Sequence, residues 1–307
     1  MSKYFVKYDM MENEHIKHFG ENYPDNTFYV IRRKPLGAGL LSNVNWVLSH
    51  VNYAVLKGYI PVVNMKDYKT LYNENVPIKI GAGETSNAWE YFFEQPCGYS
   101  LENIKNAKNV ILGSSENHYI DELPNPIDEN EDISKYYDLI SKYCKFNFET
   151  ISEIESKKRR FFGKNILGVL YRGTDYKTAK EHYTPPSIEL MIQKTRDVFQ
   201  QEKFDHIFIC TEDQSAVNEF CKVFTKERII VSESKRLKEY HTGRVPEIIL
   251  KNSSSAYKAG LDYLTDIYLL SQCDGIVACK CNGTSFALAL NNNKYRFSYF
   301  FDLGVNS

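Results

Sequence analysis

Residues 166–175 read Ile-Leu-Gly-Val-Leu-Tyr-Arg-Gly-Thr-Asp, an apolar run that ends abruptly in polar residues. An unbroken apolar run such as Ile166–Tyr171 indicates a strand that is buried on both faces, as in a parallel sheet. The pattern returns at 206–213, His-Ile-Phe-Ile-Cys-Thr-Glu-Asp, and at 275–285, Gly-Ile-Val-Ala-Cys-Lys-Cys-Asn-Gly-Thr-Ser. Because segments with helical periodicity separate these strands, we expect an α/β fold with a parallel sheet.

The second half of the chain supplies the remaining elements of this sheet. We expect further strands at His206–Cys210, Arg228–Val231 and Gly275–Ala278, and helices at Ser187–Gln201, Gln214–Phe224 and Ala256–Ser271. A last helix begins near Ser285, and residues 295–300 either add a strand or return to the first domain.

The first half begins with a βαβ unit of its own. It consists of a strand at Phe28–Ile31, the turn Gly37-Ala38-Gly39, a helix at Asn43–Leu56 and a strand at Ile60–Asn64. Beyond it we expect an irregular stretch at 75–98, a strand at Val110–Leu112, an acidic surface loop at 121–132 and one long helical region at 132–162. With 307 residues, the chain is long enough for roughly two domains. We expect two Rossmann-like domains, residues 1–163 and 164–307, with a cleft between them.

Composition and charge exclude several classes of protein. The 43% hydrophobic and 14% aromatic residues argue against disorder, and 38 basic against 39 acidic residues argue against a nucleic-acid partner bound through bulk positive charge. No run approaches the roughly 18 apolar residues of a membrane helix, and no signal peptide is visible. The seven cysteines lack metal-clip spacing, since Cys279-Lys280-Cys281 is the only close pair, so we expect reduced thiols. These features predict a cytoplasmic protein without an integral membrane segment, with peripheral attachment to the inner membrane as the alternative.

Polar residues follow each of three predicted strands, where ligands bind in parallel α/β sheets. They are Arg172 to Asp175, then Thr211, Glu212 and Asp213, then Asn282, Gly283, Thr284 and Ser285. An Arg fork and the N–H groups of a helix start suit phosphate oxygens, and acids suit ribose hydroxyls or a purine edge. The set therefore predicts a nucleoside-diphosphate pocket.

Each of these segments also has a purely structural interpretation. Arg172 can pair with Asp175, and Glu212 with Asp213 can be acids favoured in the first turn of a helix. Asn282-Gly283 is also an ordinary turn dipeptide.

The segment Leu167-Gly-Val-Leu-Tyr-Arg-Gly-Thr-Asp175 resembles the His-x-Arg-Arg-x-Asp signature of GDP-fucose-dependent fucosyltransferases, a superfamily of α-1,6-, nodulation and protein O-fucosyltransferases. Ile207–Asp213 is similar to their second block, which ends in Thr-Asp-Asp, and Asp266–Val277 to their third, Asp-x-x-x-Leu-Ser-x-x-Asp-x-x-Val. Gly37-Ala38-Gly39 resembles their early glycine loop. This chain departs from the family at three positions. In the first block Leu170 stands in place of the His and Gly173 in place of the second Arg, and in the second block Glu212 stands in place of the first Asp.

The resemblance implies a GT-B-like fold and an inverting, metal-independent transfer of fucose from GDP-fucose to a glycan or glycoconjugate hydroxyl, as in bacterial polysaccharide biosynthesis. Arg172 takes over the role of the family Arg on the donor's β-phosphate, and Asp266 that of the donor-pocket Asp. The chain contains no Asp-x-Asp metal clamp. Candidates for the general base are Asp175, Glu181 and His182. The implied donor-binding set is Arg172, Thr211, Glu212, Asp213, Asp266, Asn282, Gly283, Thr284, Ser285, Gly37 and Gly39.

Two further segments invite assignment. Residues 232–252 contain Lys235, Arg236, His241 and Arg244 without clear periodicity, which fits either a lid over the diphosphate or a surface loop. In the first domain Trp89, Tyr91 and Phe92 offer aromatic faces for an acceptor sugar, although we expect core packing to be the role of at least two of the three.

Two other classes of protein stay open. Gly37-x-Gly39 after a strand suggests an NAD-dependent oxidoreductase, but Ser42 stands where the third glycine belongs and the next strand ends at Asn64 rather than at an acid. The second open class is a non-catalytic nucleotide- or sugar-binding protein, because the family's His and second Arg are missing from this chain.

Overall fold

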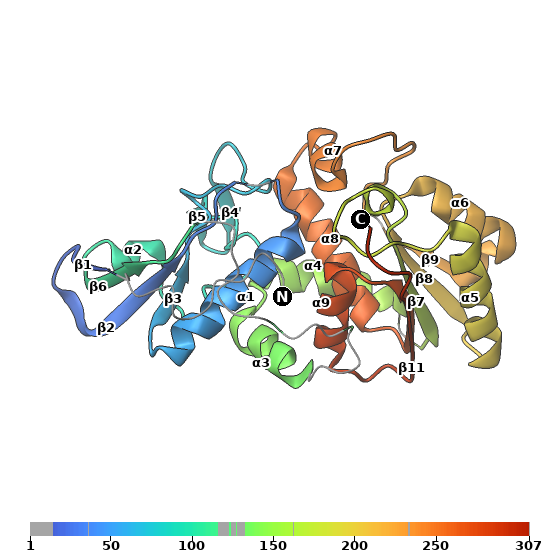
Figure 1. Cartoon of the computed structure of the whole chain (residues 1–307), viewed down its shortest axis with the longest axis horizontal. Helices are drawn as coiled ribbons and strands as arrows, with labels where there is room; N and C mark the ends of the chain where they lie inside the picture. The colour runs from blue at the N-terminus through green and yellow to red at the C-terminus, as the bar shows by residue number, and fades with distance from the viewer. Residues whose placement is uncertain are drawn as a thin grey trace. The chain divides into compact units, whose positions relative to one another are not determined.

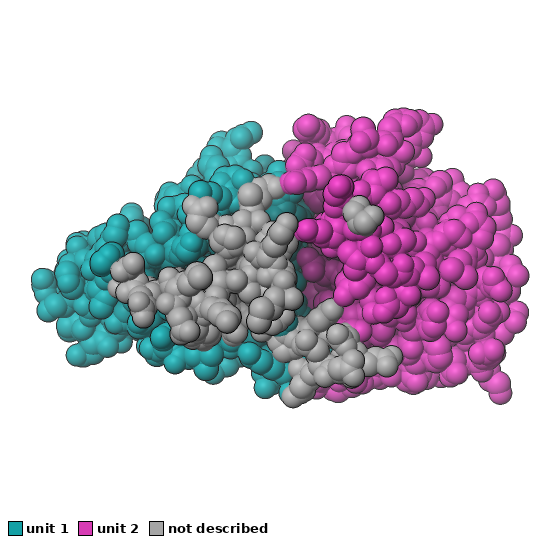
Figure 2. Space-filling view, viewed as in Figure 1, with its two compact units in different colours: residues 1–124, 132–151 teal, residues 125–131, 152–307 magenta. Residues whose placement is uncertain are grey.

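The computed structural model describes residues 15–35, 37–115, 123, 127, 133–161, 163–232 and 234–306. The chain divides into two compact units, coloured separately in Figure 2: unit 1 comprises residues 1–124 and 132–151, and unit 2 comprises 125–131 and 152–307. Each unit is built on its own β-sheet (Figure 1). The acidic segment 121–132 lies outside the described residues, apart from Leu123 and Ile127.

Unit 1 contains a four-stranded sheet in the order β1-β6-β2-β3. Its strands are β1 (Ile16–Lys17), β2 (Asn22–Ile31), β3 (Ile60–Val63) and β6 (Ala107–Leu112), all parallel except β1. Helix α1 (Leu40–Leu56) connects β2 to the parallel β3, so the predicted βαβ unit is confirmed. A small hairpin of β4 (Ile78–Ile80) and β5 (Gly83–Thr85) and the short helix α2 (Leu101–Ile104) complete the region between β3 and β6.

The long helix predicted over residues 132–162 is wrong. The structure has two helices there, α3 (Ile133–Tyr143) and α4 (Phe148–Lys158), followed by a 3₁₀ turn, Arg159–Phe161. Asn147 causes the break: its backbone N–H donates to the Phe92 carbonyl, and its side-chain oxygen accepts from Thr150 N at 3.0 Å. A side chain that bonds the first turn in this way starts a new helix rather than continuing the old one. The division between the units falls within α4.

Unit 2 contains a five-stranded sheet in the order β11-β10-β7-β8-β9, and every neighbouring pair is parallel. The strands are β7 (Ile166–Tyr171), β8 (His206–Thr211), β9 (Ile229–Val231), β10 (Gly275–Cys279) and β11 (Phe297–Phe301). The predicted strands are therefore confirmed, and residues 295–300 add a strand to this sheet.

Helices cover both faces of the unit 2 sheet (Figure 1). They are α5 (Ile188–Gln201), α6 (Gln214–Val223), α8 (Ala256–Ser271) and α9 (Asn282–Asn291), whereas α7 (Val245–Lys251) packs against α8. Leu167, Val169 and Tyr171 of β7 pack in one core cluster with residues of α5 and α6. On the other face Gly168 is so close to α8 that an added Cβ would lie 2.6 Å from Leu270 Cδ1. The continuous apolar run of β7 therefore reflects burial on both faces.

The strand order places a topological switch point between β7 and β10. The chain runs from β7 outward through β8 and β9, then returns to β10 on the other side of β7 and ends at β11. Connections on either side of such a point diverge and leave a crevice at the carboxyl ends of the two strands. In unit 2 that edge is formed by the residues after Tyr171 and after Cys279.

Candidate functional site

Arg172 is the first residue after β7 and stands at the switch point of unit 2. Its side chain is only 14% exposed. Nη2 donates to Asp175 Oδ1 at 3.0 Å, Nε lies 3.4 Å from Glu212 Oε1, and Cζ lies 4.6 Å from the centre of the Tyr176 ring. A guanidinium held by two carboxylates and an aromatic face is fixed in orientation, which suits it to bind a polyanion.

Glu212 follows β8 and is buried at this edge. Its Oε1 accepts the Thr174 hydroxyl at 2.5 Å, and burial raises the pKa of Glu212, against the opposing effect of the Arg172 charge. Glu212 therefore contacts the β7 segment on which Arg172 stands. This geometry favours positioning of Arg172 over the predicted contact with a ribose or a base.

The other residues after β8 have local structural partners. Asp213 is the N-cap of α6, and its carboxylate accepts Ser215 N at 2.8 Å. The Thr211 hydroxyl accepts Asp213 N at 3.2 Å. The contacts of Asp213 therefore match its interpretation as an acidic residue at the start of a helix.

Helix α9 begins after β10, at Asn282, beside the same edge. The Thr284 hydroxyl donates to the Cys279 carbonyl at 2.5 Å, and the Ser285 hydroxyl to the Cys281 carbonyl at 3.4 Å. Both hydroxyls thus bond the chain's own backbone, and both residues are buried. What this helix start offers an anion is the set of N–H groups in its first turn. Gly283 permits close packing, since an added Cβ would lie 3.1 Å from Ile267 and Tyr263 atoms.

Asp266 lies on α8 and is buried. Burial raises its pKa to about 7, although hydrogen bonds from Ser234 and Ser232 oppose the shift. A carboxyl group that titrates near neutrality and is held by hydroxyls from a loop is typical of a functional site.

That loop, 232–252, contains α7 and is tied down at several points. Leu237 pairs with the residues after β8, its N–H donating to Glu212 O at 2.8 Å. Val245 N donates to Asp175 Oδ2 at 3.1 Å. Arg236 donates to Ser232 O at 2.8 Å and to Gln214 Oε1 at 3.0 Å, whereas Arg244 is 63% exposed.

The base candidates Glu181 and His182 lie on an exposed loop between β7 and α5. Glu181 has a positive φ of 61°, uncommon for a residue with a side chain. The His182 ring lies edge-on to Tyr176, with 4.8 Å between ring centres.

The departures of Leu170 and Gly173 from the family blocks have a physical reason. Leu170 has an aliphatic side chain that is buried in the core, so it cannot take the role of the family His. A Cβ at Gly173 would lie 2.2 Å from ring atoms of the buried Tyr171, so an Arg cannot replace Gly173 in this conformation.

In unit 1, Gly37 has a φ of 65° and Gly39 is the N-cap of α1. The first turn of α1 is bonded by Arg33, whose Nη1 donates to Ser42 O at 3.0 Å and to Asn43 Oδ1 at 2.9 Å. The glycines therefore shape the turn into α1.

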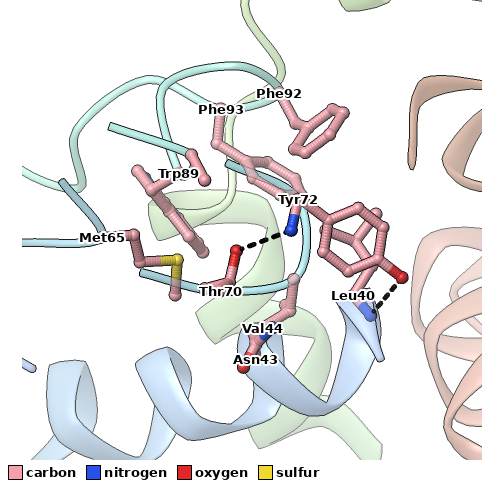
Figure 3. Close-up of a pocket in the computed structure, with 10 residues that line it drawn as sticks. Leu40, Asn43, Val44, Met65, Thr70, Tyr72, Trp89, Phe92 and Phe93 are labelled. Carbon is pink, nitrogen blue, oxygen red and sulfur yellow. Dashed lines mark hydrogen bonds between the residues drawn. The ribbon is translucent and has the colours of Figure 1, made fainter. Parts of the chain in front are cut away.

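Trp89, Tyr91 and Phe92 are all buried in the core of unit 1. Trp89 and Phe92 line a small pocket together with Leu40, Val44, Met65 and Tyr72 (Figure 3). Its free space is on the order of one water molecule. The core interpretation of these aromatic residues matches their burial.

The sequence did not indicate that the Thr174 hydroxyl bonds Glu212 or that the Tyr176 ring lies over Arg172. Thr174 lies between Arg172 and Asp175, and Tyr176 follows Asp175. Their closeness to Arg172 in the sequence could have indicated that they belong to the same site.

The fold is the same as that of solved fucosyltransferases. NodZ alpha-1,6-fucosyltransferase co-crystallized with GDP is 14% identical with a TM-score of 0.52, covering 87% of this chain and 92% of that one. POFUT1 in complex with GDP-fucose is 10% identical with a TM-score of 0.53, covering 92% and 99%. The expectation of a fucosyltransferase-like, GT-B-like α/β fold is confirmed. No protein-family model matches the chain, and no curated protein matches it significantly.

Two further findings hold for the described residues alone. None of their helices is long and apolar enough to span a membrane. Within the same ranges, no group of three or more His, Cys, Asp or Glu side chains could hold a metal ion.

Proposed function

We propose that the protein is a glycosyltransferase that transfers fucose from GDP-fucose to a hydroxyl of a glycan or glycoconjugate, with inversion and without a metal ion. The observation that carries the proposal is Arg172. It stands at the switch point of a sheet whose fold is shared with proteins solved with GDP and GDP-fucose, and its guanidinium is held by Asp175, Glu212 and Tyr176.

The chemistry assigns one main task to this site. As the acceptor oxygen bonds to C1 of the sugar, the bond from C1 to the diphosphate oxygen breaks, and its electron pair leaves with the diphosphate. Arg172 and the N–H groups at the start of α9 stabilise that developing charge, a role for which fixed donors are effective. The acceptor proton passes to a base, for which Glu181 is our candidate.

Asp175 is a weaker candidate for the base. Its two oxygens already accept from Arg172 Nη2 and from Val245 N. The geometry therefore supports a role for Asp175 in holding Arg172.

A thermal-shift screen tests the donor assignment. Wild-type protein, Arg172→Ala and Arg196→Ala are each heated with GDP-, UDP- and TDP-sugars and with NAD(H). Arg196 is an exposed Arg on α5 and serves as the matched control. We expect GDP-sugars to stabilise the wild type and Arg196→Ala but not Arg172→Ala. Stabilisation by a UDP-sugar or by NAD(H), and not by GDP, would overturn the proposal.

Turnover separates an enzyme from a binding protein. Release of GDP from GDP-fucose by the wild type, lost in Arg172→Ala, supports transferase chemistry. Tight GDP binding without turnover on any glycan acceptor favours the non-catalytic alternative, which the Leu170 and Gly173 departures suggest.

A further inference from the structure

The loop between β7 and α5 is held by a residue more than 120 positions later in the chain. Asn306 makes five hydrogen bonds to residues 176–184, and Figure 1 shows the segment near the C label beside this loop. Its Nδ2 donates to Tyr176 O at 2.6 Å and to Ala179 O at 3.0 Å, and its Oδ1 accepts the Thr184 hydroxyl at 2.8 Å.

The backbone of Asn306 adds two bonds at the turn of the same loop. Its N–H donates to His182 O at 2.9 Å, and its carbonyl accepts Glu181 N at 3.1 Å. Thr184 N also donates to Gly304 O at 2.9 Å, and Tyr183 bridges antiparallel to Val305. One side-chain amide therefore fastens the start and the end of the loop, while the backbone fastens its middle.

This fastening holds two features in place: a strained turn at Glu181 and, at the start of the loop, the Tyr176 ring that lies over Arg172. Glu181 has a φ of 61°, a conformation that persists in a residue with a side chain only where surrounding contacts enforce it. The N–H of this residue is the one that donates to Asn306 O. At the start of the loop, the Tyr176 carbonyl is bonded by Asn306 and the Tyr176 ring lies over the Arg172 guanidinium.

We propose that Asn306 is a positioning residue of the active site, which fixes the 176–184 loop so that Tyr176 and Glu181 are presented beside Arg172. The proposal rests on the proposed function, because the loop matters for catalysis only if Arg172 binds the donor. The ion pairs of Arg172 with Asp175 and Glu212 do not involve Asn306, so we expect its substitution to lower turnover more than donor affinity.

The test compares Asn306→Ala with Val305→Ala, which alters a neighbouring side chain that is 56% exposed. Three quantities are measured: hydrogen exchange of a peptide spanning 176–184, the Kd of GDP, and the kcat of GDP release from GDP-fucose. For Asn306→Ala we expect faster exchange in that peptide alone, a GDP Kd within about 3-fold of the wild type, and a kcat lower by about 100-fold, as for a misplaced catalytic group. Val305→Ala behaves as the wild type.

A second pair of variants guards against a folding defect in Asn306→Ala. Thr184→Val removes only the hydroxyl that donates to Asn306, whereas Thr184→Ser retains it. Faster exchange and lower kcat in Thr184→Val but not in Thr184→Ser support the proposal.

Unchanged exchange at 176–184 in both Asn306→Ala and Thr184→Val overturns it, as does a kcat equal to that of the wild type. If the wild type binds no GDP, the proposed function fails instead, and the exchange measurement alone decides whether Asn306 fixes the loop.

Discussion

Asp175 accepts a hydrogen bond from Arg172 through one carboxylate oxygen at 3.0 Å and from the backbone N–H of Val245 through the other at 3.1 Å. Val245 is the first residue of α7, so this carboxylate joins the proposed phosphate ligand to the loop 232–252. Donor binding at Arg172 and the order of α7 are therefore expected to be linked.

Asp175→Asn tests that linkage. The Asn side chain has one acceptor oxygen and one NH₂ donor. It can therefore accept a hydrogen bond from Arg172 or from Val245 N, but not one on each group, and one of the two contacts is lost. We expect faster hydrogen exchange at residues 245–251 and weaker GDP binding by roughly 10-fold, the loss of one charge-assisted hydrogen bond. If Asp175 instead acts as the base, kcat falls while exchange at α7 and GDP affinity stay at wild-type values.

Glu212→Gln is expected to lower stability by about 2 kcal/mol, less than the full cost of breaking a buried ion pair because Asp175 still faces Arg172. Gln retains an acceptor for the Thr174 hydroxyl, so the substitution removes the negative charge of Glu212 while keeping this hydrogen bond. Because a bound diphosphate replaces the missing negative charge, saturating GDP should shrink the deficit in urea unfolding. A deficit that GDP leaves unchanged would show that the phosphates do not meet Arg172.

The raised pKa of Asp266 is expected to make the free energy of unfolding depend on pH. Its pKa is about 7 in the folded protein, against about 4 in an unfolded chain. Between these values the folded state binds more protons than the unfolded state, so stability falls as pH rises, by about 1.4 kcal/mol per pH unit at most. The contribution is complete below pH 4 and lost above pH 7.

The measurement compares unfolding of the wild type and Asp266→Asn from pH 4 to 8. The variant keeps an acceptor for Ser234 but does not titrate, so the difference between the two proteins should grow in favour of Asn as pH rises. A difference that is constant over this range contradicts the raised pKa.

Gly173→Ala is expected to destabilise the protein by about 1–3 kcal/mol, because the new Cβ meets the buried Tyr171 ring at 2.2 Å. Gly83→Ala is the matched control, since its Cβ meets no atom closer than 4.0 Å. Thermal unfolding of both variants decides the matter. Equal stabilities would mean that Tyr171 moves aside readily, and that the missing second Arg has another cause.

The central strands of the unit 2 sheet, β7, β8 and β10, were predictable from the sequence because they are buried on both faces. Ile166–Tyr171 has no polar residue, and its ends are marked by Asn165 and Arg172. The long helix at 132–162 was not predictable in its true form, because the break at Asn147 depends on a contact with Phe92, far away in the chain.

The candidate site was predictable to the level of the strand ends. Arg172, Glu212 and the start of α9 lie at the edge where parallel topology brings them. Sequence alone could not show that the Thr284 hydroxyl bonds the Cys279 carbonyl, nor that Glu212 bonds Thr174, because both depend on side-chain direction. The contacts of Asn306 were likewise invisible, since they join segments distant in sequence.

Calorimetric titration of GDP into the wild type and into Arg172→Ala tests the central claim most directly. The account predicts saturable binding of GDP by the wild type, weakened by about 10- to 100-fold in Arg172→Ala and unchanged in Arg196→Ala. Equal GDP affinity in the wild type and Arg172→Ala, or no binding by the wild type, would contradict it.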